Sequence, residues 1–441
     1  MTETVPFTPL EEAIFYIERM HGPWNVQFEV ETTAGIDPAR LRAAVVTACN
    51  VHPLARARRR PHDESDGRDG RCHWVVPGAI SELPPGTVTV ADDLSASETS
   101  AFYRERFDPT AELPFRILVG RGDGQADGDR VLICSNHVAA DGVGCARFVR
   151  SVCRAYRGEA LDAPSVDLGT ARAAVGDAGP TSPRTALKLL GDGLRSLGTT
   201  LREPARIAGN GGVETEGWLF ERRRLDADLT ERVLGERSEG ATVNDVLLAA
   251  LHRCIEAWNR EHGEPARRIS VMMPLNLRPR EWFYDVVGMF TTIASVSTRR
   301  RDRRGTGTTL RTVVEQTRRV KDRDRTTIPH EVAKLLPSGT PVGLKEWVPE
   351  LLDGLGRRFV DTAVLSNLGR MPAPWPGFIP DDDPTLWFSP PSFTLAPVGI
   401  GVATVGGTIH LTGRYWRRTF DADAATSFTD RYLDCLESVV R

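Results

Sequence analysis

The chain has 441 residues, with 56 Lys and Arg against 59 Asp and Glu, which gives a formal net charge of −3. This length exceeds what one ordinary hydrophobic core holds, so we expect two lobes. A near-neutral chain gives no support for nucleic-acid binding. The seven cysteines form no Cys-x-x-Cys pair, and no segment is apolar enough to span a bilayer. We therefore expect a cytoplasmic protein without a metal, a nucleic-acid partner or an integral membrane segment.

The first part of the chain predicts a mixed α/β lobe. Asp37 and Pro38 form a helix start, and that helix must end before Pro53. Residues 115–121 and 130–135 are predicted strands, joined by a hairpin loop over 122–129. A further helix is predicted from Asp141 to Gly158, because its apolar residues recur on one face.

The composition changes near residue 163, where Gly, Ala, Pro, Thr and Asp begin to dominate. We predict an N-terminal lobe over 1–165, a linker or crossover over 166–216 with one amphipathic stretch at 186–201, and a C-terminal lobe over 217–441. In this last part Thr242 precedes a strong helical pattern that runs through Trp258. Strands are predicted over 269–274, 288–296, 362–365, 400–405 and 408–415, and a closing helix over 421–440.

One segment carries most of the chemical information. The apolar run from Val131 to Ser135 leads directly into Asn136 and His137, and Asp141 and Gly142 follow. A strand that ends in a histidine sets an imidazole at the edge of a sheet, where clefts commonly form. The bare pattern also fits a structural histidine, or a pair of metal ligands formed by His137 and Asp141, although no third ligand lies nearby in the sequence.

This segment resembles the His-His-x-x-x-Asp-Gly motif of the chloramphenicol-acetyltransferase-like superfamily, which includes nonribosomal peptide condensation domains, polyketide-associated acyltransferases and wax ester synthases. Asn136 stands where the family has the first His. Further segments resemble the family in the expected order, namely Pro6 to Glu12, His52 to Arg56, Thr242 to Leu251, Pro274 to Arg278, Val287 to Phe290 and Ser366 to Gly369.

The resemblance implies an α/β fold of two similar lobes arranged in a V, with an active-site tunnel at their junction. It implies that His137 is the catalytic general base and that Asp141 forms an ion pair with Arg278. The remaining residues implied as structural support of the site are Asn136, Gly142, Ser366 and Asn367.

The implied activity is acyl transfer from a thioester to an amine or alcohol, in natural-product or lipid biosynthesis. The donor would be an acyl or peptidyl carrier protein with its pantetheine arm, or acyl-CoA, so no separate cofactor is expected. Two alternatives stay open. Asn136 and the free-standing length also fit a non-catalytic docking protein, and a wax-ester or acylglycerol synthase would show an exposed apolar surface.

Two arginine clusters also stand out, the first at Arg56, Arg58, Arg59 and Arg60, the second at Arg299, Arg300, Arg301, Arg303 and Arg304. They are read either as solvated loop charge or as a landing site for an acidic carrier protein.

Overall fold

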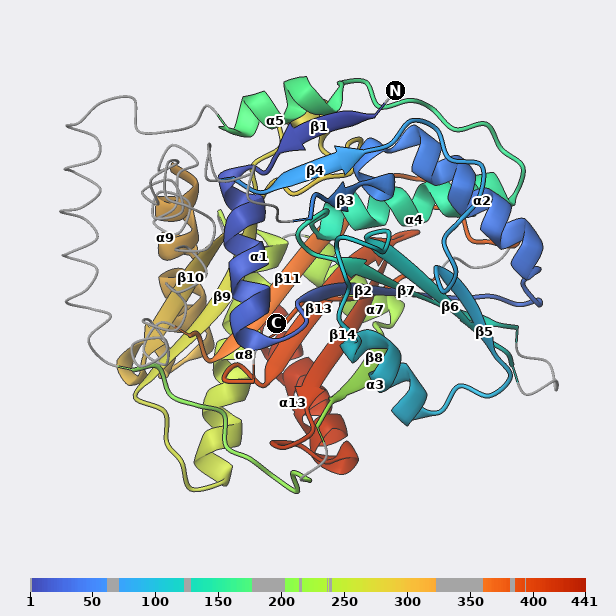
Figure 1. Cartoon of the computed structure of the whole chain (residues 1–441). Coiled ribbons are helices and arrows are strands. Elements are labelled where there is room, and N and C mark those ends of the chain that lie inside the picture. Colours follow the sequence, from blue (N-terminus) through green and yellow to red (C-terminus); the bar gives the residue numbers. More distant parts are fainter. Residues whose placement is uncertain are drawn as a thin grey trace, which may run out of the picture.

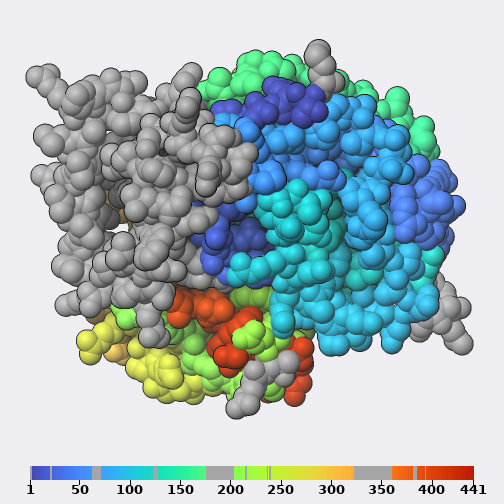
Figure 2. Space-filling view, viewed as in Figure 1, coloured from blue at the N-terminus to red at the C-terminus, as the bar shows by residue number. Residues whose placement is uncertain are grey.

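The computed structural model describes residues 2–61, 71–122, 128–176, 203–213, 216–235, 237, 240–322, 360–380, 385–392 and 394–441. It contains two large sheets with helices packed on them, as expected for two α/β lobes (Figure 1). In the space-filling view, the blue and cyan atoms of the first half and the yellow and red atoms of the second half occupy separate regions (Figure 2).

The first large sheet has five strands in the order β12, β2, β7, β6, β5. The side chains of Val26, Phe28 and Val30, at every second position of β2, lie on one face of the strand. They belong to the apolar core beneath helices α2 and α4. The elements of this lobe are β2 (Asn25–Glu31), α2 (Pro38–Val51), the 3-10 turn η1 (Pro53–Arg56), β5 (Val88–Ala91), α3 (Ala96–Arg104), β6 (Phe115–Gly120), β7 (Arg130–Asn136) and α4 (Gly142–Tyr156).

The edge strand of this sheet comes from the other half of the chain. Strand β12 (Trp387–Ser389) pairs antiparallel with β2, in the register Trp387 to Glu29. A segment that lies far along the chain thus completes the first sheet and ties the two lobes together.

The second large sheet has six strands in the order β10, β9, β11, β13, β14, β8. Helices α8 and α13 pack against each other and bury their apolar faces on this sheet, with Trp258, Tyr415 and Phe428 in the core. The elements are β8 (Trp218–Arg224), α7 (Ala227–Leu234), α8 (Val243–Glu261), β9 (Arg268–Asn276), η3 (Arg280–Trp282), β10 (Thr291–Arg299), η4 (Arg300–Arg303), α9 (Thr306–Asp322), β11 (Ala363–Arg370), β13 (Val398–Val405), β14 (Thr408–Trp416) and α13 (Ala422–Val440).

A third apolar cluster joins the two halves. It contains Phe15, Trp24 and Val138 from the first half together with Met272 and Phe290 from the second. Around it lie a small sheet in the order β1, β4, β3 and two helices, namely β1 (Glu3–Pro6), α1 (Pro9–His21), β3 (Arg58–Arg59), β4 (His73–Val76) and α5 (Leu168–Gly176).

Most of the predicted elements are present, with shifted ends. Strand β10 begins at Thr291 rather than Gly288, because the carbonyls of Val286 and Gly288 bond to Arg278 and the N–H of Phe290 bonds to Asp141. Strand β2 was not predicted, although its apolar residues alternate. The middle of the hairpin loop and the amphipathic stretch at 186–201 lie outside the described residues. The lobe boundaries stay a prediction.

Candidate active site

His137 lies directly after β7, in the turn that leads into α4. It is 9% exposed, and its ring packs edge-on against the indole of Trp24, with 5.4 Å between the ring centroids. Its neighbours Val138 and Ala139 belong to the apolar cluster that joins the two halves. The predicted catalytic residue therefore lies at the junction of the lobes and not within the core of one lobe.

The imidazole of His137 is held in one tautomer. Its Nδ1 lies 3.0 Å from the carbonyl oxygen of Ala140. Because a carbonyl can only accept a hydrogen bond, Nδ1 carries the proton and donates it, and Nε2 keeps its lone pair. Burial lowers the pKa of His137, and this effect outweighs the opposing influence of the Ala140 carbonyl and Asp141. The ring is therefore neutral near pH 7, with Nε2 able to accept a proton.

Asp141 is the N-cap of α4 and the centre of a buried hydrogen-bond network. Its Oδ1 accepts the N–H of Gly144 at 2.9 Å. Its Oδ2 accepts the Arg278 guanidinium at 2.6 Å, the N–H of Phe290 at 2.9 Å and the hydroxyl of Thr291 at 2.8 Å. Burial by itself would raise the pKa of Asp141, but the Arg278 charge and these hydrogen bonds bring it below the ordinary value. Asp141 is thus ionised and fully paired.

Arg278 is the ion-pair partner of Asp141, as the family resemblance implies. The Arg278 side chain is fully buried, and its Nη2 donates to the carbonyls of Val286 and Gly288 at 3.1 and 3.0 Å. Its guanidinium also lies 4.6 Å from the centroid of the Phe290 ring. The N–H of Asp141 donates to the Gly288 carbonyl, so the main chains of the two lobes are bonded here directly.

Two glycines of α4 permit this close approach. A Cβ at Gly144 would lie 2.9 Å from the backbone nitrogen and oxygen of Gly288. A Cβ at Gly142 would lie 2.8 Å from the Leu368 side chain. Of the two, the sequence prediction included only Gly142.

Asn136 is buried beside His137 at the position of the first motif histidine. Its Oδ1 accepts the N–H of Val138 at 3.0 Å, and its Nδ2 donates to the Glu18 carboxylate at 3.2 Å. Sequence reasoning missed Glu18 and Trp24. A signal for Glu18 was present, because it lies on the same helical face as Leu10 and Ile14, where an apolar residue would be expected.

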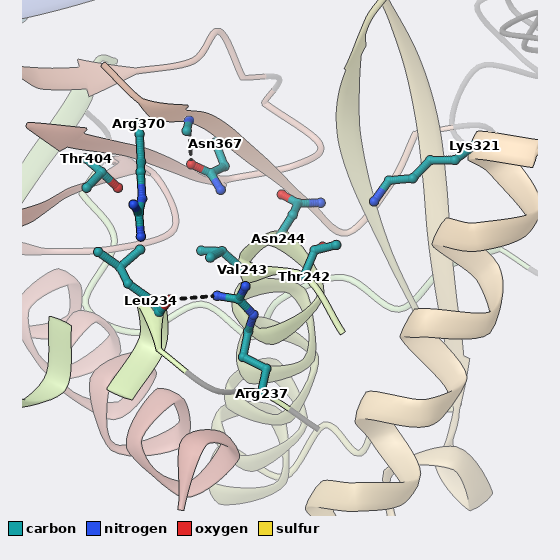
Figure 3. A pocket seen from close by; sticks show the side chains of 10 residues that line it. Leu234, Arg237, Thr242, Val243, Asn244, Lys321, Asn367, Arg370 and Thr404 are labelled. Carbon is teal, nitrogen blue, oxygen red and sulfur yellow. Dashed lines mark hydrogen bonds between the residues drawn. The ribbon is translucent and has the colours of Figure 1, made fainter. Parts of the chain in front are cut away.

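Ser366 and Asn367 lie on β11. Ser366 is buried opposite Gly401 of β13. Asn367 accepts the N–H of Gly369 and lines a cavity of about 400 Å³ beside the start of α8, together with Asn244 and Lys321 (Figure 3). Their neighbour Leu368 meets Gly142, so β11 supports the site through that contact. His137 does not line this cavity, and the tunnel stays a prediction.

The carboxylate of Asp141 already accepts hydrogen bonds from four donors. It is therefore poorly suited to bind a metal ion together with His137. Within the described ranges, no group of three or more His, Cys, Asp or Glu side chains is placed to hold a metal ion. None of the helices described is both long and apolar enough to cross a membrane.

The arginine clusters divide into structural and solvent-facing members. Arg56 donates to the carbonyls of Pro77, Cys49 and Asn50, and the buried Arg303 donates to those of Thr298 and Ala266. These two arginines therefore stabilise the fold and are not solvated charge. The exposed members are Arg299, Arg300, Arg301 and Arg304, whereas Arg58, Arg59 and Arg60 are half-buried.

The architecture resembles several solved structures over its whole length. The epimerization domain from the third module of tyrocidine synthetase B matches with a TM-score of 0.67 and 16% identity, over 100% of this chain and 96% of that one. The condensation domain of the Monacolin K polyketide synthase MokA matches with a TM-score of 0.66 and 15% identity, over 99% and 97%. The chain therefore has the two-lobed fold of condensation domains, a chloramphenicol-acetyltransferase-like fold.

No protein-family model matches the sequence. The uncharacterized protein Rv2305 of Mycobacterium tuberculosis (strain ATCC 25618 / H37Rv) is 31% identical over 441 residues, which cover 99% of this chain and 100% of that protein. The chain belongs to the same family as this mycobacterial protein.

Proposed function

We propose that this protein is an acyltransferase that moves an acyl group from a thioester donor to an amine or alcohol. One observation carries the proposal. A neutral imidazole, with its Nδ1 proton fixed on the Ala140 carbonyl, lies at the junction of the two lobes with Nε2 as the basic atom. The solved condensation-domain fold supports the choice of reaction class.

In the proposed reaction, the nucleophile attacks the thioester carbonyl carbon while Nε2 of His137 takes the proton from its nitrogen or oxygen. The carbon–sulfur bond then breaks, and the imidazolium returns the proton to the departing thiolate sulfur. The N–H of Gly142, the first residue of α4, is our candidate for stabilising the oxyanion. The Asp141–Arg278 joint holds the turn that carries His137 and takes no part in proton transfer.

The donor is proposed to be a carrier protein with its pantetheine arm, or acyl-CoA. The wax-ester alternative predicts an exposed apolar surface. Among the described residues, the exposed large hydrophobic side chains are Val90 and Val213, which lie on different segments. This arrangement gives the lipid-directed alternative no support.

The test is turnover of the purified protein with a panel of acyl-CoA and acyl-carrier-protein donors and a panel of amines and alcohols. Formation of amide or ester by the parent, lost in His137→Ala, is the expected result. A folded parent that binds carrier protein but forms no product with any pair would favour the docking alternative instead.

A further inference from the structure

The buried carboxylate of Glu18 has no role in the chemistry described so far, yet it lies beside the turn that carries His137. Glu18 is on the last turn of α1 and is 7% exposed. Its carboxylate accepts Nδ2 of Asn136 at 3.2 Å and is stabilised by the backbone N–H of Trp24. Within the described part of the chain it has no ion pair, so its burial is costly and calls for a reason.

One partner of Glu18 precedes His137 in the chain, and the other packs on its ring. Asn136 precedes His137, and its Oδ1 accepts the N–H of Val138, the residue that follows. Trp24 places its indole edge-on against the imidazole. A single carboxylate therefore links the residue that precedes His137 to the residue that packs on its ring.

We propose that Glu18 is a positioning residue for His137, acting through Asn136 and Trp24 in place of the contact that a first motif histidine would make. The inference rests on the proposed acyl transfer for its kinetic consequences. The structural consequence, a fixed imidazole, can be measured without any turnover.

The charge of Glu18 should matter because a carboxylate is a stronger acceptor than a neutral carboxyl or amide. Burial raises the pKa of Glu18 to about 7, against the opposing effects of Asn136, Arg106 and the Trp24 N–H. Arg106 stays charged in this range, and the buried Cys134 thiol on β7, which also interacts with Glu18, stays neutral because burial raises its pKa to about 12. Glu18, bonded to the residue before His137, is therefore a group whose charge changes around neutrality.

The variants for the test are Glu18→Gln, Asn136→Ala and their combination. Glu18→Gln keeps the shape and an acceptor for Asn136 but removes the charge. Glu12→Gln is the matched control, because Glu12 is also buried on α1 but accepts the N–H of Cys72, away from Asn136. Circular dichroism confirms that each variant is folded.

The first readout is the ¹⁵N and ¹H NMR of the histidine rings, with the His137 signals assigned by comparison with His137→Ala. In the parent we expect these signals to shift as the pH passes through the Glu18 transition. Glu18→Gln should abolish that shift, and Glu12→Gln should retain it. An unchanged His137 titration in Glu18→Gln would overturn the proposal, even if the protein proves to have no acyltransferase activity.

The second readout is the pH profile of kcat/KM. The parent should gain about fivefold as Glu18 ionises, since charged acceptors bind more strongly than neutral ones. Glu18→Gln should lose that rise. In the Asn136→Ala background, the same substitution should have a clearly smaller effect than in the parent, because only the contact with Trp24 then remains. Fully additive effects, or a rise that persists in Glu18→Gln, would reject the positioning role while leaving the proposed function intact.

Discussion

Arg278 and Asp141 are 137 residues apart in the sequence, and their side chains form an ion pair of 2.6 Å from which solvent is excluded. The pair joins the start of α4 in one lobe to the end of β9 in the other. The Asp141 carboxylate also accepts from Gly144, Phe290 and Thr291, and Arg278 also donates to two main-chain carbonyls. These additional hydrogen bonds offset part of the cost of burying the pair.

Removing one partner of this pair should be strongly destabilising. Asp141→Ala leaves the Arg278 guanidinium buried without its counter-charge, and we expect a loss of about 3–5 kcal/mol in the free energy of unfolding. Urea titration measures this. Asp228→Ala is the control, because Asp228 pairs with Arg232 on the surface of α7, where such a pair contributes little. If Asp141→Ala and Asp228→Ala lower the free energy of unfolding equally, the buried pair of Asp141 and Arg278 does not stabilise the contact between the lobes.

The same pair predicts the acid sensitivity of the fold. The pKa of Asp141 is below its ordinary value, so the stability that it contributes is present above the unfolded-state pKa. That contribution is lost as the pH falls through the lowered folded-state pKa. We expect the free energy of unfolding in urea to depend less on acid pH in Asp141→Asn than in the parent. Parallel pH profiles of the two proteins would contradict this.

Glu18 predicts a pH dependence of the opposite sign. Its pKa is raised from 4.5 to about 7, so the folded state binds the proton more tightly than the unfolded state. Its stabilising contribution is therefore lost as the pH rises through about 7. Glu18→Gln should raise the free energy of unfolding, relative to the parent, by an amount on the order of 3 kcal/mol above about pH 8 and by little near pH 5. An equal difference at both pH values would contradict a raised pKa.

His137→Ala should damage the chemistry more than the fold. We expect kcat to fall roughly 10²–10⁴-fold, with donor binding and the melting temperature nearly unchanged. Since the pKa of His137 is lowered by burial, its free base should persist below about pH 6.5, so Glu18→Gln, which lacks the Glu18 transition, should keep its activity there.

The control for this substitution is His262→Ala. The Nδ1 of His262 also lies against a backbone carbonyl, that of Trp258, but in the other lobe. His262→Ala should lose no more activity than a substitution on the protein surface. Near-parental turnover in a folded His137→Ala would remove His137 as the base.

Gly144 should not tolerate a side chain. Its Cβ would meet the Gly288 backbone, which is fixed by Arg278, so Gly144→Ala should cost about 1–3 kcal/mol by overpacking. The same substitution at Gly307, on the exposed side of α9 with nothing within 4 Å, should stabilise by up to about 1 kcal/mol. Thermal melts compare the melting temperatures of the two variants with that of the parent. If both substitutions shift the melting temperature equally, the close packing of Gly144 on Gly288 does not contribute to stability.

If the donor is an acidic carrier protein, the exposed arginines are expected to receive it. Replacing Arg300, Arg301 and Arg304 with Ser should raise the apparent KM for carrier-bound donor, and added salt should reduce the difference, since exposed charges are screened over about 8–10 Å. Replacing Arg58, Arg59 and Arg60 tests the half-buried cluster in the same way. If neither salt nor these substitutions change the KM, the two clusters are solvated charge and do not bind the carrier protein.

The sequence by itself determined the local framework. Apolar periodicity and capping residues such as Asp37, Asp141 and Thr242 were enough to place α2, α4 and α8, because helix starts depend on neighbouring residues. The ion pair of Asp141 with Arg278 was also predictable, but only through the family resemblance of the two motifs, since spacing alone says nothing about a contact between distant residues.

Only the tertiary structure decided which surfaces meet. The pairing of β12 with β2 and the contact of Leu368 with Gly142 depend on how the two lobes close on each other. The burial of Arg303 depends on long-range packing within the second lobe, against Ala266 and Glu256. The same holds for Glu18. Its place on the inner face of α1 could be read from the helical period, but its bond to Asn136 arises because folding brings the end of α1 against the end of β7. Long-range packing, and not local propensity, sets that contact.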